Sequence, residues 1–336
     1  MAAGAIAGCL SEVGDDAFDA DDGGYAAFFT LHDWAEQVGG DVIDFENPVD
    51  VGEMGHGWSP DGDLASDVAT SAIFVYLDSP EFSWAQDLAD TLERDYEDDV
   101  VLVNGLEGID LLEWDHDHDD HDHDDHHDDH DDDHHDDHDD DHHDDHDDDD
   151  HDHDHDHGEY DPHVWVDPVR AKQVVENIAG GLAEVDPDNE DTFEENAAAY
   201  AERLDALDER FRELVDDAER RVGVIAGHDS FQYLEDRYGF ELHSPTGVSP
   251  DQSPSTNDIA DTIDFVNEEG IEVILYDYFE APDLAETIVE NSDATEVAAV
   301  SPTEGTTEEW NDEGWGYVEQ MEEINVPAFE KALGSP

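Results

Sequence analysis

Short apolar segments alternate with stretches of helical periodicity in the first half of the chain. Strand-like runs lie within 24–41, 65–78 and 99–110, and apolar residues recur at helical spacing in 83–96. Strands that alternate with helices in this way are typical of α/β units with a parallel sheet. We therefore expect residues 24–187 to form an N-terminal α/β lobe.

The middle of the chain carries one long helical pattern. Residues 189–221 contain neither proline nor glycine, and their apolar residues recur every three or four positions. At about 1.5 Å per residue, this pattern predicts a helix of roughly 45 Å. We expect residues 188–221 to form a rigid helix that links the N-terminal lobe to a second lobe.

A second set of strand-like segments follows the predicted linking helix. Apolar runs within 222–231, 271–282 and 294–302 are separated by helical patterns, so residues 222–336 are expected to form a C-terminal α/β lobe. The predicted fold class is α/β, with two α/β lobes whose parallel sheets are joined through one long rigid helix.

The predicted N-terminal lobe is interrupted by a run in which every residue from Asp115 to His157 is aspartate or histidine. This Asp/His run holds 17 of the 22 histidines and 26 of the 100 acidic residues. A segment without apolar residues cannot bury a core, so residues 115–157 are expected to be a disordered loop. Its histidines indicate metal binding. A low-complexity expansion in an acidic proteome is the alternative, although it accounts for the aspartates and not for the histidines.

The formal net charge of −90 is spread over the chain, since most acidic residues lie outside the Asp/His run. Lys172 and Lys331 are the only lysines. Such a charge repels itself at low ionic strength and is screened in molar salt, so we interpret it as the solvated surface of a halophilic protein. Nucleic acid is disfavoured as a partner because no basic patch is present to neutralise phosphates.

The N-terminal segment contains the single cysteine, Cys9, directly after the small residues Ala7 and Gly8. This stretch resembles the lipobox of prokaryotic lipoprotein signals, in which the cysteine is lipidated. We expect residues 1–23 to be a truncated signal and a flexible tether, with Cys9 anchoring the protein to the outer face of the cell membrane. An ordinary N-terminus with a chance cysteine is the alternative.

Three histidines outside the run lie in predicted loops or at strand ends: His56, His163 and His228. Ligand sites in open α/β sheets form outside the carboxyl ends of strands, so two facing lobes bring such loops together. Neutral imidazole is a zinc ligand, and three imidazoles with one oxygen complete a tetrahedron. Each histidine taken singly is more often structural, and the spacing along the chain does not decide between these interpretations.

Two longer motifs carry a resemblance to a known family. The segments "DPHVWVDPVRAKQVVENIAGGLAEVDP" and "GHDSFQYLEDRYGFELHSPTGVSPDQSPS" are similar to the cluster A-I solute-binding lipoproteins, the metal-binding subunits of zinc and manganese ABC importers. The resemblance covers about residues 24–335. It implies two lobes with the metal between them and a membrane permease that receives the metal. Zinc-type members often carry a His-rich acidic loop just before Asp-Pro-His, which accounts for where the run ends.

The resemblance implies a role for each of the three histidines. His163 matches the family's second histidine ligand and His228 the third, where manganese-type members usually have glutamate, so zinc is favoured. His56 matches the first ligand, although "EMGHGWSP" departs from the family's Pro-Gly-x-x-Pro-His-like loop. His32 and His243 match no ligand position and are interpreted as structural or surface residues. Because imidazole must be neutral to ligate, the zinc affinity is expected to fall as the pH drops through about 6.5.

The fourth ligand of the family follows a strand near the end of the chain. It is an aspartate in manganese-type members and the glutamate of a Pro-x-Glu stretch in some zinc-type members. Here the stretch is Ser301-Pro302-Thr303-Glu304, and we expect Glu304 to be the ligand, because the hydroxyl of Ser301 keeps its proton. Asp277, at the end of "IEVILYD", and a water molecule are the alternatives.

The sequence thus predicts an extracytoplasmic zinc-binding lipoprotein, a monomer, that captures Zn²⁺ between two lobes and delivers it to the permease of an ABC importer. Zinc is then the transported ligand and not a catalytic cofactor. A metal buffer acting through the Asp/His run and a manganese-type importer subunit are the alternatives. A zinc enzyme is disfavoured, since no His-Glu-x-x-His, nucleophile elbow or phosphate loop is found. Asp229 is expected to orient a ligand rather than to act as a base.

Overall fold

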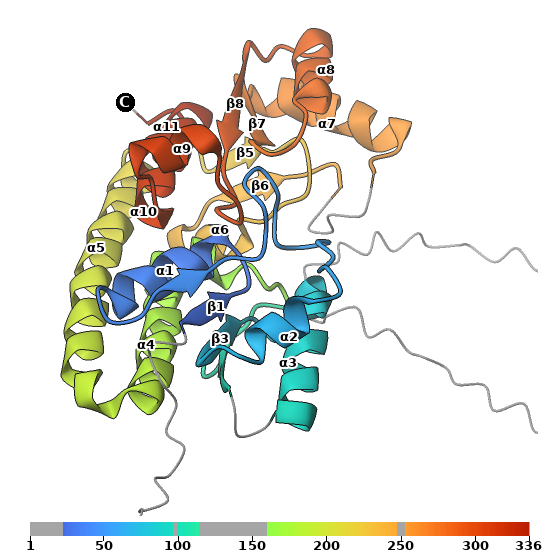
Figure 1. Ribbon diagram of the computed structural model, residues 1–336. Coiled ribbons are helices and arrows are strands. Elements are labelled where there is room, and N and C mark those ends of the chain that lie inside the picture. The colour runs from blue at the N-terminus through green and yellow to red at the C-terminus, as the bar shows by residue number, and fades with distance from the viewer. Residues whose placement is uncertain (1–22, 97–99, 114–159, 247–252, 336) are drawn as a thin grey trace, which may run out of the picture.

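The computed structural model describes residues 23–96, 100–113, 160–246 and 253–335, which form two α/β lobes (Figure 1). Cys9 and the Asp/His run lie outside the described residues, so the lipid anchor and the disordered loop stay predictions. Among the helices of the described residues, none combines the length and the apolar character that crossing a membrane requires. The predicted fold class, two α/β lobes with parallel sheets and a long helix, is confirmed.

The N-terminal lobe is built on a parallel sheet with the strand order β2-β1-β3-β4. The strands are β1 Gly24–Ala26, β2 Phe45–Glu46, β3 Ile73–Tyr76 and β4 Val101–Asn104. The helices are α1 Phe29–Gly39, α2 Leu64–Val68, α3 Ser83–Tyr96 and α4 Pro168–Val185, with the 3₁₀ turns η2 Pro80–Phe82, η3 Val164–Val166 and η4 Pro187–Asn189.

The C-terminal lobe repeats this strand order. Its strands, all in parallel pairs, are β5 Val222–Val224, β6 Glu241–His243, β7 Val273–Asp277 and β8 Glu296–Val300. A parallel bridge from Ile225 to Leu275 joins the two pairs in the order β6-β5-β7-β8. The helices are α6 Gln232–Tyr238, α7 Thr256–Glu269, α8 Asp283–Asn291, α9 Glu308–Glu313, α10 Tyr317–Gln320, the π-helical turn η5 Met321–Asn325 and α11 Val326–Leu333.

In each lobe the strand order reverses beside the first strand, between β1 and β3 and again between β5 and β7. Loops that leave the carboxyl ends of strands at such a reversal diverge and form a crevice, the usual place for a ligand in an open α/β sheet. The repeated topology therefore supplies one crevice from each lobe.

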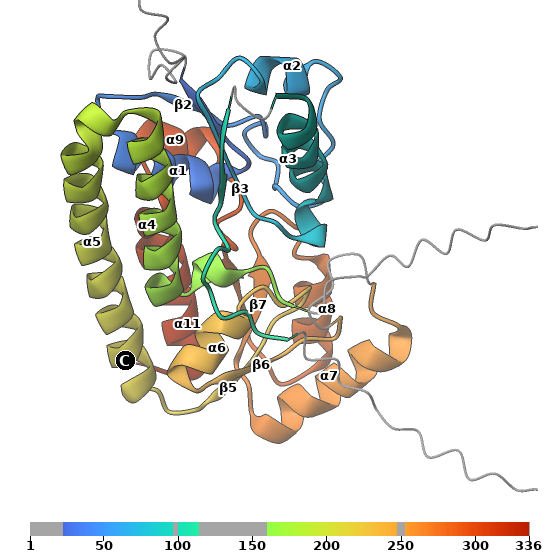
Figure 2. The ribbon, with the colours of Figure 1, turned by 90° about the horizontal axis from the view of Figure 1, so that it is seen from below.

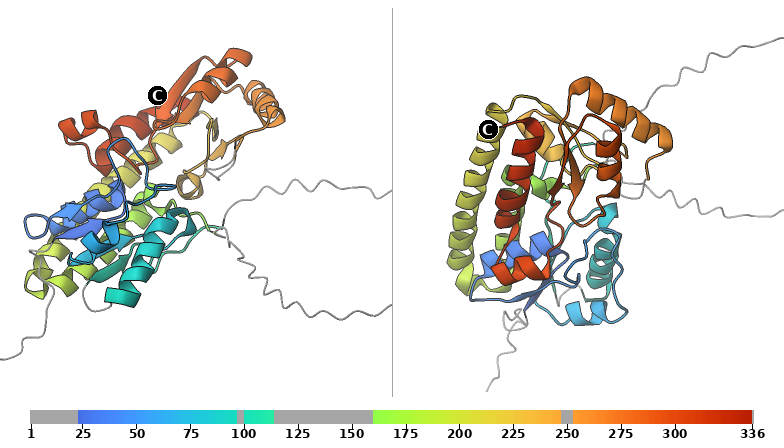
Figure 3. Two further views of the ribbon diagram at one scale, coloured as in Figure 1. Left: turned by 45° about the vertical axis from the view of Figure 1, so that its right-hand side comes forward. Right: turned by 90° about the horizontal axis from the view of Figure 1, so that it is seen from above.

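The linking helix, α5 Glu190–Asp216, runs along one side of both lobes (Figure 3) and lies beside α4 (Figure 2). Its 27 residues correspond to about 40 Å. It ends before the predicted residue 221, because the chain turns there into the C-terminal lobe, where the Arg220 amide donates to the Leu333 carbonyl over 3.1 Å. The lobe boundaries at 187 and 222 stay predictions.

One apolar core extends from the N-terminal lobe past α5 into the C-terminal lobe. Buried members include Trp34 on α1, Phe211 on α5, Val300 on β8 and Phe329 on α11. The rings of Phe211 and Phe329 lie 6.2 Å apart between centroids. Because separating the lobes would expose this surface to water, the hydrophobic effect holds them together.

Hydrogen bonds between the lobes meet at Trp165, beside His163. The indole nitrogen of Trp165 donates to the Pro302 carbonyl over 2.8 Å. The hydroxyl of Tyr317 donates to the Trp165 carbonyl over 2.6 Å, and the Tyr317 amide donates to the carboxylate of Asp33 over 3.0 Å. The strand end that precedes Glu304 is therefore fixed against the turn that follows His163.

Replacing Tyr317 with phenylalanine tests this connection. Tyr317 is fully buried, so Tyr317→Phe takes away the hydroxyl donor of a buried carbonyl and should lower the free energy of unfolding by about 1–3 kcal/mol. Denaturant unfolding in molar salt measures the change. Tyr278→Phe, at a side chain that is 41% exposed, is the matched control and should leave the stability unchanged. Equal stabilities of the two variants would show that the hydroxyl does not hold the lobes.

Candidate metal centre

The three predicted histidines and Glu304 come together between the lobes. His56 lies in the loop after β2, and His163 immediately precedes η3, both in the N-terminal lobe. His228 lies in the loop after β5 and Glu304 in the loop after β8, both in the C-terminal lobe. Four separate segments thus supply one side chain each, and the two lobes contribute equally.

Glu304 faces histidines from the opposite lobe. The imidazole Nδ1 of His56 lies 2.5 Å from Oε2 of Glu304, and Nε2 of His163 lies 3.7 Å from Oε1. The ring centroid of His228 lies 5.5 Å from that of His56 and 5.8 Å from that of His163. Each carboxylate oxygen therefore lies near a different imidazole, and His228 contacts both rings.

This group is shielded from solvent. His163, His228 and Glu304 are 3%, 4% and 0% exposed, and the side chain of His56 is 13% exposed. Both ring nitrogens of His228 and Oε1 of Glu304 are buried and have no hydrogen-bond partner among the described residues. Because buried polar atoms are rarely left unpaired, these atoms indicate a site for a bound ligand, and imidazole nitrogens with a carboxylate are the donor set of zinc.

The Asp-Pro-His motif fixes the ring of His163. Oδ1 of Asp161 lies 2.6 Å from Nδ1 of His163 and also accepts the His163 backbone amide over 2.8 Å. Asp161 is itself fully buried, and its carbonyl accepts the Tyr233 hydroxyl over 2.6 Å. A carboxylate on one ring nitrogen sets the tautomer and directs the other nitrogen, Nε2, to the site.

The loop that carries His56 is held by a close approach at Gly55. A Cβ atom on Gly55 would lie 2.6 Å from Cβ of Phe28, so only glycine fits. The Gly55 carbonyl accepts the indole nitrogen of Trp84 over 3.0 Å. These contacts hold the loop that carries His56 against the core of the N-terminal lobe.

The loop that carries Glu304 contains an unusual backbone conformation. Thr303 has a φ of 60°, which is strained for a β-branched residue. The Thr303 carbonyl accepts the Thr30 hydroxyl from the N-terminal lobe, and its amide donates to the Ser301 hydroxyl over 3.1 Å. These bonds hold the strained residue in place and turn the next side chain, Glu304, towards the histidines.

The electrostatics follow from this pairing. The Glu304 carboxylate raises the pKa of His56 to about 9, against the opposing effect of burial. Burial alone would raise the pKa of Glu304, but the imidazoles of His56, His163 and His228 outweigh it and lower the pKa to about 2. For His163, burial opposes the charged form, but Asp161 prevails and raises the pKa. His56 and Glu304 therefore form an ion pair near neutral pH.

Asp277, the alternative fourth ligand, lies at the end of β7 and is 3% exposed. Burial raises its pKa to about 7. Asp277 lies close to His228 and Glu280. One potential ligand atom from each of these three residues lies within 4.8 Å of the other two. Glu280 was not among the residues expected from the sequence, and its one signal there is its position three residues after Asp277.

The prediction that Asp229 orients a ligand is wrong. Its carboxylate accepts the Phe231 backbone amide over 2.9 Å, whereas neither ring nitrogen of His228 has a hydrogen-bond partner in the described part of the chain. Burial raises the pKa of Asp229 and also that of neighbouring Glu235, the latter to about 10, so this pair holds a proton. The Asp229 carboxylate is instead engaged in the turn that starts α6.

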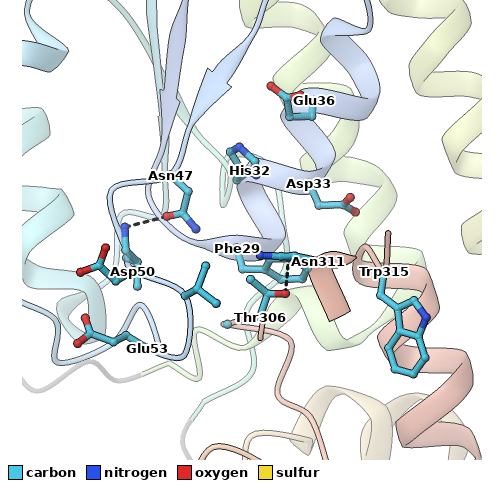
Figure 4. A pocket seen from close by; sticks show the side chains of 13 residues that line it. Phe29, His32, Asp33, Glu36, Asn47, Asp50, Glu53, Thr306, Asn311 and Trp315 are labelled. Atoms are coloured by element: carbon cyan, nitrogen blue, oxygen red, sulfur yellow. Dashed lines mark hydrogen bonds between the residues drawn. The ribbon is translucent and has the colours of Figure 1, made fainter. Parts of the chain in front are cut away.

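The other two described histidines make structural contacts. His32 lies with Nε2 3.1 Å from the Phe45 carbonyl, and His243 stacks on Phe265 with 4.5 Å between ring centroids. His32 also lines a cavity of about 400 Å³ between α1, the loop after β2 and the start of α9 (Figure 4). None of the four candidate ligands lines this cavity, so it is separate from the histidine group.

Comparisons with known proteins show the family of this chain. The family model described as ZnuA, zinc-uptake complex component A periplasmic, matches residues 25–332. The zinc-binding lipoprotein AdcA of Streptococcus pneumoniae is 28% identical over 307 residues, which cover 90% of this chain and 54% of that protein. The high-affinity zinc uptake system protein ZnuA of Bacillus subtilis is 29% identical over 307 residues, 91% of this chain and 86% of that protein. The chain thus spans about half the length of the pneumococcal relative.

A solved structure matches both lobes. The crystal structure of the Zn(II)-bound ZnuA-like domain of Streptococcus pneumoniae AdcA is 26% identical in sequence and has a TM-score of 0.69. The match covers 92% of this chain and 97% of that domain. The family expected from the Asp-Pro-His and Gly-His-Asp motifs is confirmed: this chain belongs to the ZnuA family, the component A proteins of zinc-uptake complexes.

Proposed function

We propose that this protein captures Zn²⁺ between its two lobes and delivers it to the permease of an ABC importer. His56, His163, His228 and Glu304 would be the four ligands. One observation carries the proposal: three imidazoles and one buried carboxylate converge from four loops, and three of their polar atoms have no other hydrogen-bond partner among the described residues.

The donor set suits zinc as a cargo. Three neutral nitrogens and one carboxylate complete a tetrahedron, the usual zinc geometry, whereas manganese prefers more oxygen ligands. The carboxylate also neutralises one of the two charges of the ion. A site with four protein ligands leaves no open position for water or substrate, so binding and not catalysis is the expected activity. The relatives, a zinc-binding lipoprotein and a zinc uptake protein, support this choice of metal.

The cellular setting is part of the same proposal. A lipid on Cys9 would hold the protein at the outer face of the cell membrane, as the lipoprotein relative suggests. The protein would act as a monomer, since both halves of the site come from one chain. The acidic surface would keep it solvated in molar salt, because screening there reduces the repulsion between carboxylates.

Substituting each ligand histidine tests the site. Residues Glu113 and Tyr160, which flank the Asp/His run, form an antiparallel bridge, so the run can be removed without separating its ends. In that shortened chain His56→Ala, His163→Ala and His228→Ala should each weaken zinc binding by more than the roughly 10–100-fold typical of losing an outer-shell partner. Chelator competition measures the affinity. His32→Ala is the control and should bind as the parent does; unchanged affinity in all three site variants would refute the site.

The charge of Glu304 should set the pH dependence. Since the pKa of His56 is raised to about 9, a proton competes with zinc below that pH, and the affinity should rise from pH 6.5 to about 9. An ordinary imidazole, with a pKa of about 6.5, would give little further rise in affinity above that pH. Glu304→Gln removes the carboxylate that raises the pKa of His56, so the zinc affinity of this variant should stop rising near pH 6.5. The loss of affinity relative to the unsubstituted protein should therefore be largest at pH 9. Even there it should be smaller than the loss caused by replacing a histidine. A profile identical to that of the unsubstituted protein would contradict this pairing.

We further propose that the Asp/His run binds additional zinc weakly and raises its concentration near the lobes by tethering. Ordering a flexible chain around each ion costs conformational entropy, so this binding should be exchangeable. Removing residues 115–157 should lower the total number of bound zinc ions in a titration but leave one tight site. If the tight site disappears with the run, the protein is a metal buffer instead.

A further inference from the structure

A second group of ligand atoms lies on the C-terminal lobe beside the four-residue site. One ligand atom each from His228, Asp277 and Glu280 lies within 4.8 Å of the others. His228 comes from the loop after β5, and the two carboxylates come from the end of β7 and the turn after it. β5 and β7 flank the reversal in strand order, so the crevice of this lobe brings the three together.

The local backbone prepares these carboxylates for a ligand. One oxygen of Asp277 accepts the Phe279 amide over 2.8 Å, while the other, Oδ2, is buried without a hydrogen-bond partner among the described residues. The Glu280 amide donates to the Asp277 carbonyl over 3.1 Å, and this tight turn brings the two acids together. The chain thus orients Asp277 and leaves one oxygen of it available.

Glycine at position 227 makes room for Glu280. Gly227 has a φ of 151°, and a Cβ atom there would lie 3.2 Å from Oε2 of Glu280. The other carboxylate oxygen, Oε1, lies 3.9 Å from Nδ1 of His228, and the Glu280 side chain is 40% exposed. The carboxylate therefore reaches the buried imidazole from the solvent side.

The two groups share His228. One imidazole and two carboxylates offer a divalent cation one nitrogen and at least two oxygens, and water completes the coordination where Glu280 meets solvent. The ring of His228 also lies 5.5 Å from that of His56 and 5.8 Å from that of His163 between centroids. An ion can therefore keep His228 as a ligand while it leaves the two carboxylates and moves into the four-residue site.

We propose that His228, Asp277 and Glu280 form an outer zinc position through which the ion enters and leaves the four-residue site. The proposal rests on the zinc function proposed above. A closed site on a rigid frame exchanges its ion slowly, because its four ligands must be replaced one after another where water has little access. An outer position keeps the ion partly coordinated during transfer, which lowers the barrier in both directions and leaves the affinity of the inner site nearly unchanged.

Anomalous diffraction at the zinc edge locates the ion in the full chain. In the double variant His56→Ala, His163→Ala, zinc should give a peak among His228, Asp277 and Glu280. Adding Glu280→Gln should abolish the peak, whereas adding Glu290→Gln, on the exposed face of α8, should retain it. If the double variant shows no peak while the unsubstituted protein binds zinc at the four residues, the outer position is refuted and the proposed function still holds. No zinc at the four residues of the unsubstituted protein would overturn the proposed function.

The kinetics of zinc exchange distinguish two roles for Glu280: a ligand that transfers the ion, or a residue that only orients His228. With the four ligands intact, Glu280→Gln should slow both zinc capture and chelator-driven release about tenfold, a change of roughly 1.4 kcal/mol in each barrier, with little change in the dissociation constant. Glu290→Gln should leave both rates unchanged. A weaker affinity with an unchanged capture rate would instead make Glu280 a residue that only positions the imidazole, and would refute the transfer role.

Discussion

The buried carboxylate of Glu304 is the constraint on which the arrangement of the two lobes depends. Burying a charge costs several kcal/mol unless a partner compensates it. Among the described residues, the ion pairs of Glu304 are with His56 and His163, both from the opposite lobe. The N-terminal lobe must therefore lie against Glu304, because its histidines supply the positive charge that compensates the buried carboxylate. A divalent cation bound by the same side chains would compensate that charge as well.

The backbone next to Glu304 is strained where it directs this carboxylate to the histidines. Thr303 occupies a left-handed conformation that costs on the order of 1–3 kcal/mol for a residue of its kind. Hydrogen bonds from Thr30 to Thr303 and from Trp165 to Pro302 join that strained turn to the N-terminal lobe. Tertiary contacts offset the strain, as is common where a functional side chain must be aimed against local preference.

The frame behind the site favours retention of the ion over release. Helix α5 and the continuous core leave the lobes little freedom to separate, and the four candidate ligands are shielded from water. The proposed delivery to a permease nevertheless requires that the ion be released. Carboxylates at the rim of the same group reconcile the two demands, because they let the ion move stepwise while the lobes stay closed.

The sequence by itself determined the alternation of strands and helices, the long helix and the motifs around His163 and His228, because these depend on residues close together in the chain. It also indicated Glu304 from its position after Pro302. Tertiary structure decided that His56 meets Glu304 across 248 positions of sequence, that Asp161 and not Asp229 orients a histidine, and that Glu280 approaches His228. Periodicity encodes which face of an element is buried, whereas the meeting of distant loops follows only from how two sheets pack around a shared core.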